Sequence, residues 1–214
     1  MTDESAGGAN GPAAGAAGFV RAARVSDAPA LARVQVASWQ ATLGGLVPPA
    51  VLSELSSEAA VAQFGERWRE AITNPPTSRH KVLVAYAPGA PGEPVGFASI
   101  GPATDEDRWP GTDGELYELH VRPEVAEPAN DPSSHGASTH GASGHGGRLL
   151  HAAADTLAED GFHTACTWVL AADSDRVEFL QAAGWAADGS QGNLDMGVKV
   201  PVIRLHTRLE TAGQ

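Results

Sequence analysis

The feature that most constrains the fold is a glycine-rich turn that lies between two strand patterns. Residues 114–121, GELYELHV, predict a strand, and a helical pattern then runs from about Gly146 to Gly161. A second strand pattern, HTACTWVL, follows at residues 163–170. A strand, a helix and a second strand in this order predict a right-handed crossover between two parallel strands. We therefore expect an α/β sheet with helices packed on it.

The rest of the chain extends this sheet. The other predicted elements are strands over 19–24, 81–87, 94–100, 194–200 and 201–209, and helices over 26–39, 53–74 and 173–185. A turn rich in Pro and Gly joins the strands at 81–87 and 94–100, which predicts an antiparallel hairpin. Phe64, Trp68 and Ile72 recur at helical spacing and are expected to pack in the core. Gly161 and Gly184 follow helical patterns and predict their ends. The sheet should be mixed and mostly antiparallel.

Length and composition favour one soluble domain. A chain of 214 residues with 42% hydrophobic content can bury one substantial core, which we expect over 19–209, between tails at 1–18 and 210–214. The single cysteine, Cys166, excludes an internal disulfide and fits a reducing compartment. The N-terminal segment lacks the basic and apolar regions of a secretory signal, and no run of about 18 apolar residues is present. These features predict a cytoplasmic protein.

The charge of the chain restricts its partners. The formal net charge is -12, which repels nucleic acid and anionic membranes at long range. An anionic ligand would need a local binding device, and the glycine turn supplies one. Gly144, Gly146 and Gly147 expose backbone N–H groups at the start of a helix, and Arg148 adds a cation in its first turn. Neither the dinucleotide-binding glycine pattern nor the Gly-Lys-Ser/Thr of a phosphate-binding P-loop occurs.

These motifs and their order resemble the GNAT superfamily of N-acetyltransferases. The matching stretches are ELYELHVRPE, GHGGRLLHAAADTLAEDG and TWVLAADSDRVEFLQAAGW, with SWQATLGGLVPP resembling the first-helix region of a bacterial branch. The resemblance implies a single GNAT-type domain and acetyl-CoA as co-substrate. It also implies a set of cofactor-binding residues: Leu119, His120, Val121, Gly144, His145, Gly146, Gly147, Arg148 and Asp173. Trp39, Gln40 and Thr42 lie where the family builds its acceptor pocket.

The loop before the turn departs from the family pattern. Val121 and Gly144 are 23 positions apart, and Gly141 stands where the family has Gln or Arg. His135, His140 and His145 each precede a glycine at a period of five residues. We interpret this tract as an expansion of the strand-to-helix loop, about 124–143, whose last unit is functional. The histidines lack a carboxylate or thiolate at set spacing, so no physiological metal site is expected.

Acetyl transfer to an amine requires a general base. A lysine-like amine with a pKa of about 10.4 is neutral at pH 7 in only about one of 2,500 molecules. Glu115 and Glu118 are the candidates, and their odd spacing predicts that they point to opposite faces of the strand. The resemblance favours Glu115. The family's tyrosine acid is replaced by Leu180 and its asparagine by Asp173, which leaves Tyr117 or water as the acid, or implies lost activity.

We therefore expect an acetyl-CoA-dependent N-acetyltransferase that acts on a primary amine of a small molecule or peptide by direct attack. A non-catalytic acyl-CoA-binding or interaction module of the same fold is the alternative, because of Leu180, Asp173 and Gly141. A histidine-loop metal-binding protein is a third interpretation. The sequence leaves the acceptor and the oligomeric state, a homodimer included, open.

Overall fold

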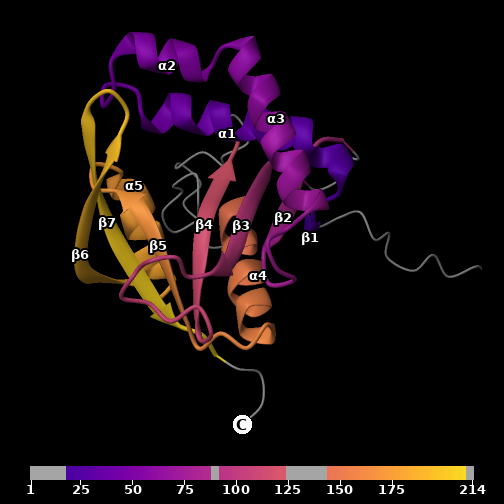
Figure 1. Ribbon diagram of the computed structural model, residues 1–214, viewed down its shortest axis with the longest axis vertical. Coiled ribbons are helices and arrows are strands. Elements are labelled where there is room, and N and C mark those ends of the chain that lie inside the picture. The colour runs from indigo at the N-terminus through magenta and orange to yellow at the C-terminus, as the bar shows by residue number, and fades with distance from the viewer. Residues whose placement is uncertain (1–17, 88–91, 124–143, 211–214) are drawn as a thin grey trace, which may run out of the picture.

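A computed structural model of the chain describes residues 18–87, 92–123 and 144–210. Residues 1–17, 88–91, 124–143 and 211–214 lie outside this range, and so does the loop expansion predicted at about 124–143. The described residues form one sheet of seven strands with the spatial order β1-β2-β3-β4-β5-β7-β6 (Figure 1). The strands are β1 Phe19–Ala22, β2 Lys81–Tyr86, β3 Gly96–Pro102, β4 Asp113–Val121, β5 Thr164–Leu170, β6 Ala186–Asp195 and β7 Lys199–Arg208. The helices are α1 Ala28–Thr42, α2 Pro49–Leu55, α3 Glu58–Thr73, α4 His145–Glu159 and α5 Ser174–Ala182, with a short 3-10 turn at Val25–Asp27.

The pairing of the strands confirms the predicted mixed sheet. β1 to β4 form an antiparallel meander, β4 and β5 are parallel, and β5, β7 and β6 are antiparallel. The helix α4 supplies the crossover between the two parallel strands. Gly161 follows the end of α4 and Gly184 follows the end of α5, and they have φ values of +83° and +86°. Both glycines take the left-handed conformation that terminates a helix, as predicted.

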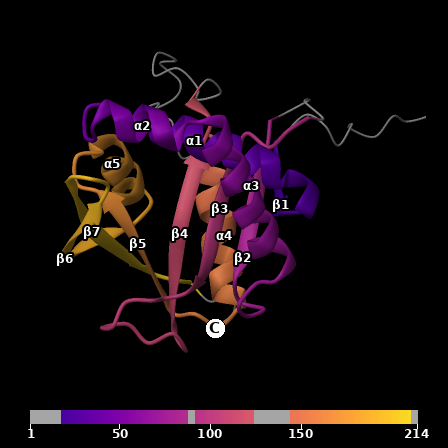
Figure 2. The same ribbon diagram turned by 45° about the horizontal axis from the view of Figure 1, so that its top comes forward.

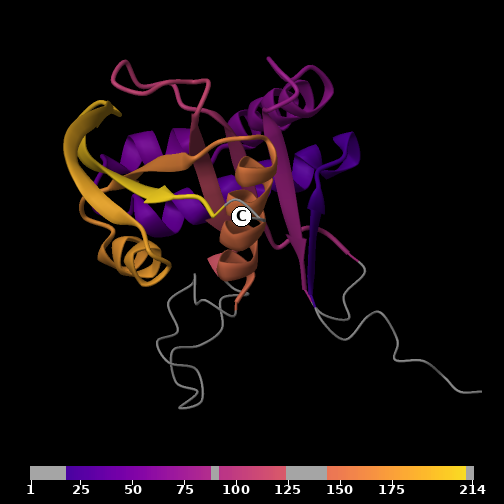
Figure 3. The same cartoon turned by 90° about the horizontal axis from the view of Figure 1, so that it is seen from below.

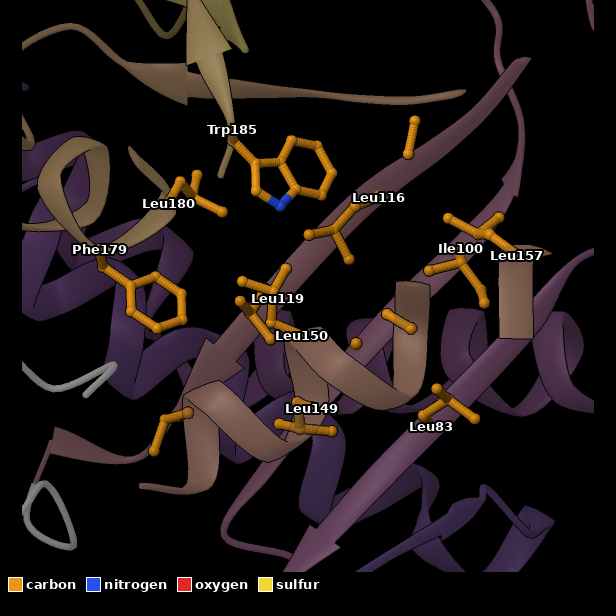
Figure 4. Close-up of a cluster of buried hydrophobic side chains, with 14 of the residues drawn as sticks. Leu83, Ile100, Leu116, Leu119, Leu149, Leu150, Leu157, Phe179, Leu180 and Trp185 are labelled. Atoms are coloured by element: carbon orange, nitrogen blue, oxygen red, sulfur yellow. The ribbon is translucent and has the colours of Figure 1, made fainter. Parts of the chain in front are cut away.

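Helices cover both faces of the sheet (Figure 3). On one face, α4 and α5 bury leucines against β3 and β4, and Trp185 completes this core (Figure 4). Each fully buried leucine contributes about 1.5–3 kcal/mol through removal from water. On the other face, α1 and α3 pack Leu31, Phe64 and Trp68 against Phe97 of β3. Phe64 and Trp68 are buried and Ile72 is partly buried, which confirms their predicted role in packing.

A third, smaller cluster covers the end of the sheet at which β4 finishes. The segment from α1 to α2 contributes Leu43 and Val47, which pack with Val200 of β7. Figures 1 and 2 show α1 and α2 crossing this end of the sheet, beside the tip of the β6–β7 hairpin. The β6–β7 tip and the α1–α2 segment therefore lie together at the same edge.

The helix predicted over 53–74 is two helices. α2 begins at Pro49, a first-turn position that suits proline because the missing N–H would be unpaired there. Ser57 then caps α3, its side chain accepting a hydrogen bond from the Ala60 N–H at 3.2 Å. The prediction merged the two helices, because both share a continuous helical composition.

The closing strands are also placed differently from the prediction. β6 spans Ala186–Asp195 and β7 spans Lys199–Arg208, so the turn is at 196–198 and not at 200–201. Gly197 adopts a φ of +75° in that turn. β6 is short of apolar side chains and mostly exposed, so it lacks the alternating pattern by which a half-buried strand is recognised.

The core between α4 and β4 gives a direct stability test. Leu157 is 1% exposed and its methyl group lies close to Gly114 of β4. We expect Leu157→Ala to lower the free energy of unfolding by about 2–5 kcal/mol, because it leaves a cavity. Urea unfolding at pH 7 measures this. The matched control is Leu194→Ala on β6, where Leu194 is 45% exposed and the expected change is within about 0.5 kcal/mol. Equal losses would contradict this description of the core.

Candidate active site

The strands β4 and β5 are paired over a short stretch and then diverge. Their parallel pairing joins Asp113–Glu115 to Thr164–Cys166 and goes no further. Beyond it, β4 runs toward α1 while β5 leans toward α5 (Figure 2). Two side chains bridge the divergence: Thr167 Oγ1 donates to the Leu116 carbonyl at 2.8 Å, and Arg176 Nη1 donates to the Leu119 carbonyl at 2.6 Å. Residues 116–121 thus have an edge that β5 does not pair, which an extended ligand can use.

The first turn of α4 lies at the same end of the sheet. Gly144 is the N-cap residue, has extended backbone angles and makes no side-chain cap hydrogen bond. Gly146 and Gly147 follow in the first turn and have no side chains to cover the N–H groups. The Arg148 Nη2 donates to His145 Nδ1 at 2.7 Å, and His145 is buried. The positive end of the α4 dipole and a guanidinium therefore lie together, which suits an anion.

A β-bulge in β4 places both candidate glutamates on one face. Ser99 pairs with Glu118 and the adjacent Ile100 pairs with Leu116, so Tyr117 is an extra residue in β4. Leu116 and Leu119, three residues apart, consequently both face the α4 core. Glu115 and Glu118 then both point to the opposite face of the sheet, where Glu118 contacts Gln35 of α1 and Glu115 contacts Thr104. The prediction that they point to opposite faces was wrong because it assumed a regular strand.

Glu115 is held where β4 and β5 part. It is the last β4 residue in the parallel pairing, opposite Cys166, and is 7% exposed. The backbone N–H and the Oγ1 of Thr104 both donate to its Oε2, at 3.0 and 2.9 Å. Burial has the largest effect and raises the pKa of Glu115 above its usual value, while the two Thr104 hydrogen bonds oppose that rise. Glu115 is therefore a better proton acceptor than an exposed glutamate.

Glu118 belongs to a hydrogen-bonded chain beneath α1. Its Oε2 accepts from Gln35 Nε2 at 2.7 Å and lies 2.9 Å from His120 Nε2. The other ring nitrogen, Nδ1, lies 2.9 Å from Ser38 Oγ. Trp68 Nε1 donates to Gln35 Oε1 at 3.0 Å, which fixes the amide. His120 satisfies every contact in this chain when Nε2 donates to Glu118 and Nδ1 accepts from Ser38.

The predicted acceptor-pocket residues are only partly brought together. Trp39 is half-buried, and its ring lies edge-on to Phe64 at 5.2 Å and to His120 at 6.4 Å. Gln40 is exposed. Thr42 donates to the Ser38 carbonyl in its own helix at 3.0 Å. Sequence reasoning missed Gln35 and Ser38, although both are polar residues at helical spacing on the apolar face of α1.

Tyr117 is directed away from the end of β4. Its hydroxyl donates to the Pro102 carbonyl at 2.5 Å, and its ring stacks on His80 with centroids 6.1 Å apart. Pro102 pairs with Gly114, near the start of β4. Burial, helped by the charge of Glu115, raises the pKa of Tyr117 above its usual value. The phenol is therefore protonated and engaged with a backbone carbonyl.

Comparison with known proteins identifies the architecture. The chain is 29% identical over 151 residues to an uncharacterised N-acetyltransferase, YuaI, of Bacillus subtilis, covering 71% of this chain and 70% of YuaI. The crystal structure of the PaiA N-acetyltransferase from Thermoplasma acidophilum with coenzyme A superposes with a TM-score of 0.61 at 16% identity, covering 90% of this chain and 99% of PaiA. YncA from Salmonella typhimurium with its cofactor acetyl-CoA gives a TM-score of 0.54 at 16% identity, covering 92% and 97%. No family model matches the chain.

The chain has the GNAT acetyltransferase fold. The fold class predicted from the sequence is thereby confirmed. Asp173 and Leu180, which the sequence predicts to differ from the GNAT pattern, have defined contacts in this structure. Asp173 accepts a hydrogen bond from the Arg176 N–H at 3.1 Å and caps α5. Leu180 is fully buried beside Phe179 and Trp185, so it is a core residue of this GNAT fold (Figure 4).

Two further properties concern the described residues only. Within 18–87, 92–123 and 144–210, no three His, Cys, Asp or Glu side chains are grouped so that they could hold a metal ion. His135 and His140 lie outside that range, and His145 contacts Arg148. In the same part of the chain, every helix is too short or too polar to cross a bilayer.

The buried state of Glu115 predicts how its removal changes stability with pH. A carboxyl group whose pKa is raised by folding stabilises the protein below its unfolded pKa, near 4.3, and that stability is lost as pH rises through the folded pKa. Glu115→Gln removes this loss of stability at high pH, and its amide oxygen can still accept the hydrogen bonds from Thr104. We expect the free energy of unfolding of the variant, relative to the natural protein, to be higher at pH 7.5 than at pH 4.5. Urea titrations at both pH values test this, and an unchanged difference would contradict the raised pKa.

Proposed function

We propose that this protein is an acetyl-CoA-dependent N-acetyltransferase that transfers an acetyl group to a primary amine of a small molecule or peptide. The observation that carries the proposal is the edge of β4 at 116–121 that β5 does not pair, beside the glycine-rich start of α4. A phosphate-bearing, extended ligand matches these two features together. The likeness to YuaI, PaiA and YncA supports the same activity.

The residues at this edge fit coenzyme A. The N–H groups from Gly144 to Gly147 would hold the pyrophosphate, because they lie at the positive end of the α4 dipole. Arg148 would add a cation, and the backbone from Leu119 to Val121 would pair with the pantetheine arm. The acetyl thioester supplies the activated carbonyl carbon that the amine attacks.

Glu115 is the general base in this proposal. Its raised pKa and its place at the divergence of β4 and β5 support this role. Glu118 faces the same side and is tied to Gln35 and His120, so it is the second candidate for the base. Because the Tyr117 hydroxyl is bonded to Pro102, water is better suited than Tyr117 to protonate the leaving thiolate. A thiol pKa of about 8.5 makes that step less demanding than deprotonating the amine.

The acceptor is proposed to be a cationic amine. The chain carries a formal charge of -12, which raises the local concentration of cations. The carboxylates Glu115 and Glu118 lie on the face that would receive the amine. Both features favour an ammonium group that loses its proton at the site.

A non-catalytic acyl-CoA-binding module remains a second candidate. Leu180 is buried in the core and supplies no acid, and the Arg176 guanidinium already occupies the Leu119 carbonyl. A protein of this kind would bind acetyl-CoA and transfer nothing.

Substitution of Glu115 distinguishes these candidates. We expect Glu115→Gln to lower kcat/KM for the best primary amine by about 10² to 10⁴-fold, because it removes the general base. The affinity for acetyl-CoA, measured by calorimetric titration, should stay within about twofold. Glu118→Gln is the matched control, since it makes the same change on the same face of β4.

Either of two results would count against the proposal. Full activity in Glu115→Gln with loss in Glu118→Gln would move the base to Glu118. Acetyl-CoA binding by the natural protein without turnover of any amine in a broad panel would establish the non-catalytic module.

A further inference from the structure

Arg204 of β7 is a buried cation at the centre of a carboxylate cluster. Its side chain is 3% exposed, and all five of its N–H groups have partners. Nε donates to Asp188 at 2.8 Å, and Nη1 donates to Asp105 and Asp107, both at 2.6 Å. Nη2 donates to Asp107 at 2.5 Å and to Ser190 Oγ at 2.7 Å.

These partners come from segments that are distant in the sequence. Asp105 and Asp107 lie in the connection between β3 and β4, and Asp188 and Ser190 lie at an irregularity in β6, between Ala187 and Gln191. Trp168 of β5 also donates to Asp105 from Nε1, at 3.0 Å. Arg204 therefore fixes the β3–β4 connection to the sheet beside β5.

The fixed connection includes, near its start, the residue that contacts Glu115. Thr104 directly precedes Asp105, and both of its donors reach Oε2 of Glu115. Connections of this kind are usually among the more mobile parts of a fold. With Asp105 and Asp107 held by Arg204, Thr104 is held against one oxygen of the carboxylate, and Oε1 is left to accept a proton.

We propose that Arg204 is a positioning residue for Glu115: it clamps residues 105 and 107 so that Thr104 keeps the Glu115 carboxylate oriented. The effect of Arg204 on catalysis rests on the proposed function, whereas its effect on the orientation of the Glu115 carboxylate does not. A buried ion-pair cluster is weak evidence for stability alone, because apolar residues of similar volume often serve as well. The connection through Thr104 to the Glu115 carboxylate supplies a functional reason for this cluster.

The charged groups around Glu115 determine the direction in which its pKa should change when Arg204 is lost. Tyr117 lies on its own strand, Cys166 on β5, Asp105 on the β3–β4 connection and Arg204 on β7. Asp105 raises the Glu115 pKa and Arg204 lowers it. Loss of Arg204 would remove the cation, leave Asp105 uncompensated and loosen the Thr104 donors. All three changes raise the pKa of Glu115.

The test is a titration of the Glu115 carboxyl carbon by 13C NMR in the full chain. We expect Arg204→Met to raise this pKa by about one unit. The control is Arg21→Met, which breaks another partly buried ion pair, with Asp27, on β1 and should leave the Glu115 pKa unchanged. No shift in Arg204→Met, or the same shift in Arg21→Met, would overturn the clamp.

A second variant, Arg204→Lys, and a second measurement, the pH dependence of kcat/KM, complete the test. Arg204→Lys retains the charge and loses the five-donor geometry, so it tests the clamp if Arg204→Met does not fold. We expect a smaller rise in the Glu115 pKa in this variant. An unchanged Glu115 pKa would overturn the proposal. With an active amine, the acidic limb of kcat/KM should move to higher pH with the NMR shift. Absence of turnover would contradict the proposed function, and the NMR result would still decide the clamp.

Discussion

The structure depends on the short parallel pairing between β4 and β5. Three residue pairs hold the two halves of the sheet together, with α4 packed behind them. Beyond Cys166, β5 continues with β7 as its partner, while β4 continues with β3. The divergence therefore follows from which strands each one pairs with. It exposes an edge of β4 next to the first turn of the helix that connects the two strands.

The bulge at Tyr117 determines what that edge carries. One extra residue lets Leu116 and Leu119 both pack on α4 and turns Glu115 and Glu118 to the opposite face of the sheet. Each carboxylate then receives donors from a different segment: Thr104 for Glu115, and Gln35 with His120 for Glu118. Burial raises the proton affinity of Glu115, and Arg204 limits how far it rises. A backbone irregularity thus places the carboxylates, and the charges around them tune their chemistry.

Much of this could be predicted from local sequence. The crossover at β4, α4 and β5, the apolar spacing of Phe64 and Trp68, and the helix-ending glycines are all short-range signals, and the structure confirms them. The bulge was also visible in principle, because Leu116, Leu119 and Val121 are spaced by three and then two residues. The Arg204 cluster was not, since it joins residues nearly 100 positions apart. β6 escaped prediction because small polar residues on an exposed edge carry no periodicity.

We propose that the edge of β4 that β5 does not pair and the start of α4 bind acetyl-CoA. The most direct test is an amide NMR titration of the full chain with acetyl-CoA. We predict that the largest shift changes fall on residues 117–121 of β4 and 144–148 of α4, with little change along β6. An absence of shift changes at millimolar acetyl-CoA, or changes confined to other parts of the sheet, would contradict the account.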